Sequence, residues 1–240
     1  MAQLQLLRYT SYPKRGVALI FVIHEKRKGS KKDLKDLEVV LLRLQFDVRK
    51  HIDCTAAQVR DVLEKVSKED HNNNECLLIV SMTHGSKEKL TFKDRDISVD
   101  ELWDYFIGNK CASLFGKPKL VFVQSCRGNK YDAGTRKCFD SEPPKVEPVT
   151  VCLPMYADLL VMYSTYEDHV SFRCEKEGSW FIQSLCQVLA CDIAQVDLLR
   201  LLTHVTYLVS CRSDGSGENI VKQTPTINST LSKAFYFLPK

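Results

Sequence analysis

The sequence has no apolar run long enough to cross a bilayer. The longest, Val17–Ile23, has seven residues, whereas a membrane-spanning helix needs about 20. The start of the chain, Met1-Ala2-Gln3-Leu4, also lacks the basic residues and apolar stretch of a signal peptide. We therefore expect no membrane association and no secretion, and a location in the cytoplasm or the nucleus.

The chain has little net charge and no glycine-rich phosphate loop. Its 34 basic and 30 acidic side chains leave a formal charge of +4, which is too small to indicate a nucleic-acid-binding protein. Neither G-x-G-x-x-G nor the phosphate-loop lysine motif occurs, which argues against a nucleotide-binding domain. With 240 residues, 44% of them hydrophobic, the chain can fill one large domain or two small ones.

Cysteines are plentiful, but their spacing fits no zinc site. The ten cysteines include no C-x-x-C pair and no companion histidine spacing. Several lie in apolar runs, as Cys76 does in Cys76–Val80, where cysteine acts as a small hydrophobic residue. Free thiols in a reducing compartment are therefore favoured over a disulfide framework.

Apolar runs and helical periodicities alternate before residue 125. We predict strands at 17–23, 46–48, 76–82 and 119–124, and helices at 30–44, 55–68 and 98–106. Ser30, Thr55 and Ser98 are the expected N-caps, since each has a suitable polar partner three residues on. This order predicts an α/β fold with a mostly parallel sheet, helices on both faces and right-handed crossovers.

The segment 129–150 has a different character. It contains three prolines and charged residues without periodicity, which predicts an exposed linker within one domain. Regular patterns then resume. They predict a strand at 157–164, helices at 179–191 and 196–209, a loop at 214–217 and a final strand at 234–238.

Two predicted strands end in reactive residues. One ends in Ser81–Gly85 and presents His84, and the other ends in Gln124–Gly128 and presents Cys126. Ligands of open α/β sheets bind beyond the carboxyl ends of the strands, where a cysteine and a histidine can form an activated thiol nucleophile. Because Gly85 has no Cβ, its N–H could join that of Cys126 in an oxyanion hole.

Each residue alone has an ordinary structural explanation. A lone cysteine is usually core packing, and a lone histidine after a strand is usually a loop residue. Their combination is more informative, because Arg127 and Gly128 follow Cys126 directly and His84 lies 42 residues upstream.

The sequence Gln124-Ser-Cys-Arg-Gly128 resembles the caspase signature, in which a histidine lies about 50 residues upstream. The similarity extends from Tyr9 to Phe237 and includes the segments Gly116–Leu120, Tyr163–Thr165 and Gly178–Cys186. The chain is identified as a member of this family. The resemblance implies a caspase-like three-layer α/β fold and a cysteine endopeptidase that cleaves after aspartate. It implies no metal and no organic cofactor.

Carried over position by position, the resemblance makes Cys126 the nucleophile and His84 its proton-transfer partner. It assigns the pocket for the substrate aspartate to two arginines and a glutamine, here Arg27, Arg173 and Gln124. Guanidinium groups suit this task because they bind a carboxylate through two parallel hydrogen bonds, which lysine cannot do.

The neighbouring subsites depart from the family pattern. Phe172 stands where a tryptophan is common in S2, and Val170 stands where tyrosine is frequent, so we expect a shallower and less aromatic S2 subsite. Trp180 is the expected wall of S4. The turn Arg27–Ser30, the stretch Leu201–Val205 and the tail after Thr224 are most similar to the short-prodomain caspases of epidermal differentiation.

The resemblance also implies a zymogen that is activated by linker cleavage. Residues 1–140 would form the large subunit and 141–240 the small one, and two of each would form a homodimer. Asp140 and Asp132 are the candidate processing sites, because each precedes a small residue. Asp140 is preferred because it lies nearer the middle of the linker. Expected substrates are proteins with aspartate at P1, in differentiation or programmed cell death.

A catalytically weak or inactive caspase homologue, acting as a binding or regulatory partner, is the alternative. The intact Cys126, His84 and two arginines count against it. The turn Ser86-Lys87-Glu88 counts for it, since the family has a glycine-containing turn there. Ser125 replaces a commoner alanine beside the nucleophile, which is a small change.

Overall fold

A computed structural model describes residues 7–25, 27–128, 131, 154–214 and 220–240. Its centre is a six-stranded sheet in the order β11-β8-β7-β3-β1-β2. All neighbouring strands are parallel except β11, which is antiparallel to β8. The strands are β1 (Val17–Val22), β2 (Asp47–Ile52), β3 (Leu77–Met82), β7 (Lys119–Gln124), β8 (Leu159–Tyr163) and β11 (Thr226–Ser229).

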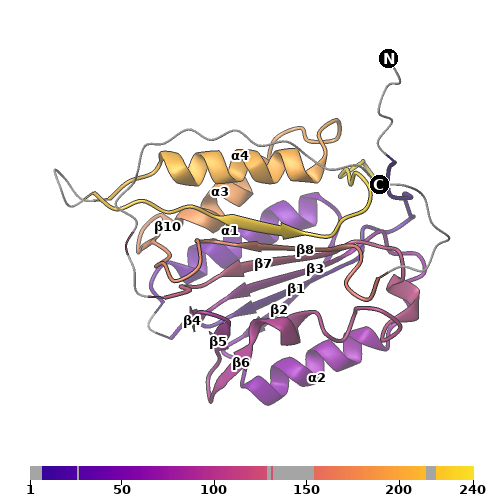
Figure 1. Ribbon diagram of the computed structural model, residues 1–240, viewed down its shortest axis with the longest axis horizontal. Coiled ribbons are helices and arrows are strands. Elements are labelled where there is room, and N and C mark those ends of the chain that lie inside the picture. The colour runs from indigo at the N-terminus through magenta and orange to yellow at the C-terminus, as the bar shows by residue number, and fades with distance from the viewer. Residues whose placement is uncertain (1–6, 26, 129–130, 132–153, 215–219) are drawn as a thin grey trace.

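Helices cover both faces of this sheet (Figure 1). One face carries α1 (Ser30–Arg43), α3 (Trp180–Leu189) and α4 (Leu198–Cys211), and the other carries α2 (Ala56–Ser67) with the small sheet β4–β6. Alternate residues of β1 enter two separate cores. Ala18 and Ile20 pack under α1 and α3, whereas Leu19 and Phe21 pack over α2. This confirms the α/β prediction and explains the unbroken apolar run.

Two smaller sheets accompany the central one in the described residues. The antiparallel strands β4 (His84–Ser86), β5 (Lys89–Thr91) and β6 (Asp96–Ser98) directly follow β3. The short strands β9 (Arg173–Cys174) and β10 (Gly178–Ser179) form a hairpin that ends at the start of α3. Neither sheet was predicted, because strands of two or three residues leave no readable alternation.

The predicted helix at 98–106 is wrong. Only the 3-10 helix η1 (Val99–Leu102) forms there, followed by turns and a second 3-10 helix, η2 (Ala112–Leu114). Glu101 does accept from the Ser98 backbone N–H, as the capping pattern predicted. The segment is rich in residues of low helix propensity, including Trp103 and Phe106, and both are buried in the core over α2.

Other predictions also needed correction. Ser30 is not an N-cap but the first residue of α1, and Gly29 holds the cap position with φ 86°. Thr55 does cap α2 through a capping box with Gln58. The final strand is β11 rather than 234–238, where Phe235 and Phe237 instead pack into the core under α4. Almost all of the predicted linker lies outside the described residues.

Candidate active site

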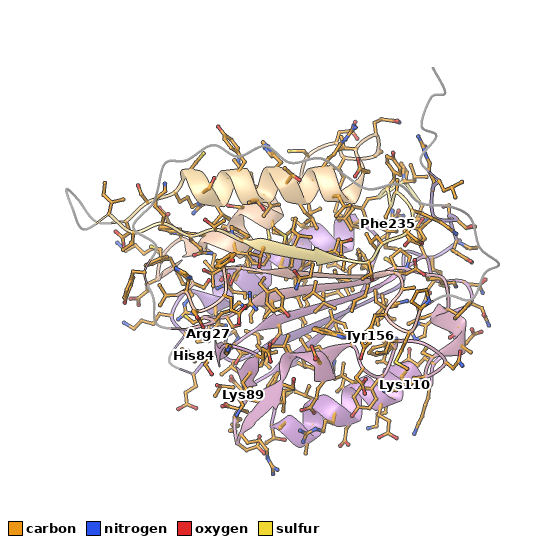
Figure 2. All side chains as sticks on the ribbon, viewed as in Figure 1. Arg27, His84, Lys89, Lys110, Tyr156 and Phe235 are labelled. Carbon is orange, nitrogen blue, oxygen red and sulfur yellow. The ribbon has the colours of Figure 1, made fainter. Side chains whose placement is uncertain are left out.

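Cys126 and His84 follow two adjacent parallel strands. Strands β3 and β7 pair from Leu77↔Lys119 to Met82↔Gln124, so the residues just beyond them reach the same edge of the sheet. Cys126 and His84 line one cavity of about 300 Å³ there. Figure 2 shows Arg27 and His84 beside each other at this edge. The structure therefore brings the two predicted catalytic side chains to one cavity.

Gly85 lies against the segment Ser125–Cys126 that follows β7. A Cβ on Gly85 would be 2.6 Å from the Lys89 carbonyl oxygen, 3.0 Å from the Ser125 Cβ and 3.1 Å from the Cys126 carbonyl oxygen. No larger residue fits without displacing that backbone. The close approach is what a backbone N–H donor beside the reacting carbonyl requires.

The altered turn after His84 is joined to Arg127, the residue after Cys126. Strands β4 and β5 pair Ser86 with Lys89, and Lys87 in the turn has φ 32°. The Lys87 N–H donates to the Arg127 carbonyl at 2.9 Å, and the Arg127 N–H donates to the His169 carbonyl at 2.9 Å. The turn thus forms without the family's glycine and still contacts the residue that follows Cys126.

Arg27 presents unpartnered donors to the cavity. Its side chain is 2% exposed, and Nη2 donates to the Gln124 carbonyl at 3.5 Å. Its Nε and Nη1 have no hydrogen-bond partner among the described residues. Burial lowers the pKa of Arg27 to about 9, and the positive charge of Arg173 contributes. Burial also lowers the pKa of Arg173.

Gln124 and Arg173 complete the same cavity. The Gln124 Nε2 donates to the Ser171 Oγ at 2.8 Å, and the buried Gln124 Oε1 has no partner in the described part of the chain. Two guanidinium groups, one of which (Arg27) has unpartnered N–H donors among the described residues, form a site that favours an anion with several acceptor oxygens. A carboxylate has that chemistry.

The residues predicted for the S2 and S4 subsites occupy different positions. Phe172 and Val170 line the cavity, and the Phe172 ring stacks on Trp180 with centroids 4.9 Å apart and planes at 28°. Trp180 is 8% exposed and supports Phe172 through this ring contact. Tyr131 lines the cavity as well, with its ring centroid 6.2 Å from that of Phe172.

Several residues of the site gave no signal in the sequence. Thr83 and Ser171 line the cavity beside the predicted residues and beside Ser125 of the Gln124–Gly128 motif. Behind it, the buried Gln223 accepts from the Phe172 N–H at 2.6 Å and donates to the Ser164 carbonyl at 2.6 Å. The Gln223 side chain thus joins the segment around Phe172 to the end of β8. No local sequence pattern indicates a residue with such a role.

The described residues contain no group of three or more His, Cys, Asp or Glu side chains that could hold a metal ion. Within the same ranges no helix is both long and apolar enough to cross a membrane. The eight cysteines that the structure describes are all free thiols. The processing candidates Asp132 and Asp140 lie outside the described residues.

The chain is similar to proteases of one family over nearly its whole length. A family model for the caspase domain matches residues 15–236, a range that includes Arg27, His84, Cys126 and Arg173. Caspase drICE of Drosophila melanogaster is 35% identical over an alignment of 240 residues that covers 94% of this chain and 70% of that protein. Caspase-3 of Mesocricetus auratus is 33% identical, with 94% and 85% covered. A crystal structure of Caspase-1 from Spodoptera frugiperda has a TM-score of 0.87 at 30% identity and covers 100% of this chain and 98% of that one.

Proposed function

Because the chain belongs to the caspase family, and is thus a cysteine protease by family, we propose that it is an endopeptidase that cleaves peptide bonds after aspartate. One observation supports the proposed specificity for aspartate. Arg27, Arg173 and Gln124 line the same cavity as the Cys126 thiol, and the Arg27 Nε and Nη1 lack partners among the described residues. Neutral side chains at P1 would leave this buried charge unpaired, at a large cost in free energy.

The proposed reaction uses four groups around the cavity. The Cys126 thiolate attacks the scissile carbonyl carbon, and His84 donates a proton to the leaving amine as the C–N bond breaks. The backbone N–H groups of Gly85 and Cys126 stabilise the tetrahedral oxyanion. Water then hydrolyses the thioester, which releases the acid product and restores the thiol.

Labelling at Cys126 tests this proposal. We expect an aspartyl peptide fluoromethylketone to add one adduct at Cys126, and the matched asparaginyl peptide to react far more slowly. The variant Cys174→Ala, which removes an exposed thiol, is the control and keeps the adduct, whereas Cys126→Ala loses it. A folded protein that gains no adduct would contradict the proposal. It would favour the alternative, a weak or inactive homologue that acts as a binding or regulatory partner.

We further propose that the protein is a zymogen in which linker cleavage after Asp140 or Asp132 separates a large part, 1–140, from a small part, 141–240. The mature enzyme is a homodimer with two copies of each part, and protein substrates with aspartate at P1 are its partners. The proline-rich, aperiodic sequence of 129–150 supports the cleavage site. Mass spectrometry of the active species would identify the C-terminus of the large part and the N-terminus of the small part.

The finer assignment that we propose is the subfamily of caspase fourteen, the short-prodomain caspase of epidermal differentiation. The turn Arg27–Ser30 with Asp33, the stretch Leu201–Val205 and the segment after Thr224 support it. The proposed setting is differentiation or programmed cell death, in the cytoplasm or the nucleus. Expression measured across differentiating epithelial layers would test it, and a uniform level in all tissues would contradict it.

A further inference from the structure

Asp33 is a buried carboxylate that lies outside the cavity lining. Its side chain is on the first turn of α1, and the residue is 1% exposed. The Ser179 backbone N–H donates to its Oδ1 and Oδ2 at 3.0 and 3.1 Å, and the Gln183 Nε2 donates to Oδ1 at 2.9 Å. These hydrogen bonds compensate part of the cost of burying the carboxylate, and they join α1 to the start of α3.

Two glycines permit this close approach. Gly178 has φ 85°, and a Cβ there would overlap the Asp33 Oδ1. Gly29, at the start of α1, has φ 86°, and its Cβ would lie 2.5 Å from the Cys174 carbonyl oxygen. At both glycines the N-terminus of α1 packs directly against the β9–β10 hairpin. Any larger residue at either position would separate the two elements.

The same two elements carry the arginines of the cavity. Arg27 is linked to the start of α1, where the Ser30 N–H donates to the Arg27 carbonyl at 3.1 Å. Arg173 is the residue that pairs with Ser179 in the β9–β10 hairpin. Asp33 therefore connects the segments that hold two guanidinium groups 146 positions apart in the chain.

The charges of Asp33, Arg27 and Arg173 also interact with one another. Burial lowers the pKa of both Arg27 and Arg173, and the Asp33 carboxylate offsets part of that lowering. Burial raises the pKa of Asp33, and the hydrogen bonds from Gln183 and Ser179 and the charge of Arg27 offset part of that rise. With Asp33 ionised, the two arginines and the one carboxylate leave a net charge of +1. A single substrate carboxylate then brings this group of charges to neutrality, which reduces the cost of burying the Arg27 charge.

We propose that Asp33 is a positioning residue for the aspartate pocket: it fixes the β9–β10 hairpin against α1 and thereby sets the spacing of Arg27 and Arg173. It acts through the two arginines and does not contact substrate. This inference rests on the proposed function and identifies a residue that determines its specificity.

The experiment compares Asp33→Asn, Asp33→Ala and Gln183→Ala with the control Glu38→Gln. Glu38 is on the same helix but pairs with Lys50, away from the cavity. For an aspartyl peptide we expect Asp33→Asn and Asp33→Ala to raise KM about tenfold, with kcat within about twofold of the wild type. Gln183→Ala raises KM less, because one of three hydrogen bonds is lost, and the control leaves KM unchanged. Alkylation of Cys126 by iodoacetamide, which needs no pocket, stays at the wild-type rate.

The outcomes separate this inference from the proposed function. A wild-type protein that cleaves no aspartyl peptide overturns the proposed function itself. If the wild type cleaves and the folded Asp33 variants keep its KM, only the role of Asp33 is overturned. A loss of iodoacetamide alkylation together with a lower kcat also overturns it, because the change then reaches the nucleophile. If the Asp33 variants do not fold, an unchanged KM in Gln183→Ala overturns the role.

Discussion

Ser171 is in direct contact with Cys126, the proposed nucleophile. The Ser171 N–H donates to the Cys126 Sγ at 3.4 Å, and the thiol donates to the Ser171 carbonyl at 3.9 Å. Phe172 and Arg173, the next residues in the chain, line the same cavity. One short loop thus contacts the Cys126 sulfur and carries two of the groups expected to bind substrate. Changes that loosen this loop should therefore alter both binding and stability.

Gln223→Ala tests the anchor of that loop. The substitution leaves the Phe172 N–H and the Ser164 carbonyl without their partner. We expect KM for an aspartyl peptide to rise and the free energy of unfolding to fall by about 2 kcal/mol, the usual cost of unsatisfied buried polar groups. Urea unfolding and steady-state kinetics measure both effects. Gln187→Ala, at an exposed position of α3, is the matched control, and equal effects in the two variants would contradict the anchoring role.

Arg173→Lys tests the aspartate pocket. Lysine keeps the charge but loses the planar pair of donors that binds a carboxylate. We expect kcat/KM for an aspartyl peptide to fall by about 100-fold with no change in the unfolding midpoint, since charge-assisted bidentate pairs are strong and geometry-dependent. Arg95→Lys, an exposed arginine paired with Asp94, is the control. An unchanged kcat/KM in Arg173→Lys would mean that the pocket has been assigned to the wrong residues.

The strands of the central sheet differ in how well the sequence predicts them. Strand β1 is an unbroken apolar run because both of its faces are buried, so its position could be predicted. Strand β11 has one apolar residue, Ile227, and lies at the sheet edge. Its pairing with β8 depends on backbone hydrogen bonds, which the residue pattern does not report. The predicted strand at 234–238 was wrong for the same reason, since core packing alone explains Phe235 and Phe237.

For the site, residues next to a recognisable motif were predictable and distant supports were not. Cys126 and His84 follow strands with a clear apolar pattern, β7 and β3, and the structure brings them to one cavity. Asp33 and Gln223 act through contacts with residues 146 and 51 positions away. Such contacts are set by the tertiary fold, so no local spacing or periodicity indicates them.

Gly85→Ala tests the backbone donor beside the nucleophile. Its Cβ would meet the Lys89 carbonyl and Ser125 at 3.0 Å or less, which displaces the donor from the reacting carbonyl. We expect kcat to fall by about 100-fold, as when one oxyanion donor is removed. Gly116→Ala is the matched control. Apart from its chain neighbours, no heavy atom in the described part of the chain lies within 4 Å of its Cβ. Its φ is +70°, so the substitution should cost about 1 kcal/mol of stability and leave kcat unchanged. A normal kcat in Gly85→Ala would exclude the donor role.

Asp140→Ala tests how the protein is activated. Asp140-Ser141 and Asp132-Ala133 each place a small residue after aspartate, so a protease with the proposed specificity can accept both, including from another copy of itself. Asp140 is nearer the middle of the proline-rich segment, where cleavage is least hindered. We expect Asp140→Ala to stop or strongly slow processing and Asp132→Ala to have a smaller effect, measured by mass spectrometry of the small subunit. An N-terminus at Ser141 or Ala133 supports self-type processing. An N-terminus after a non-acidic residue such as Val146 would contradict it, because the activating protease must then have a different specificity.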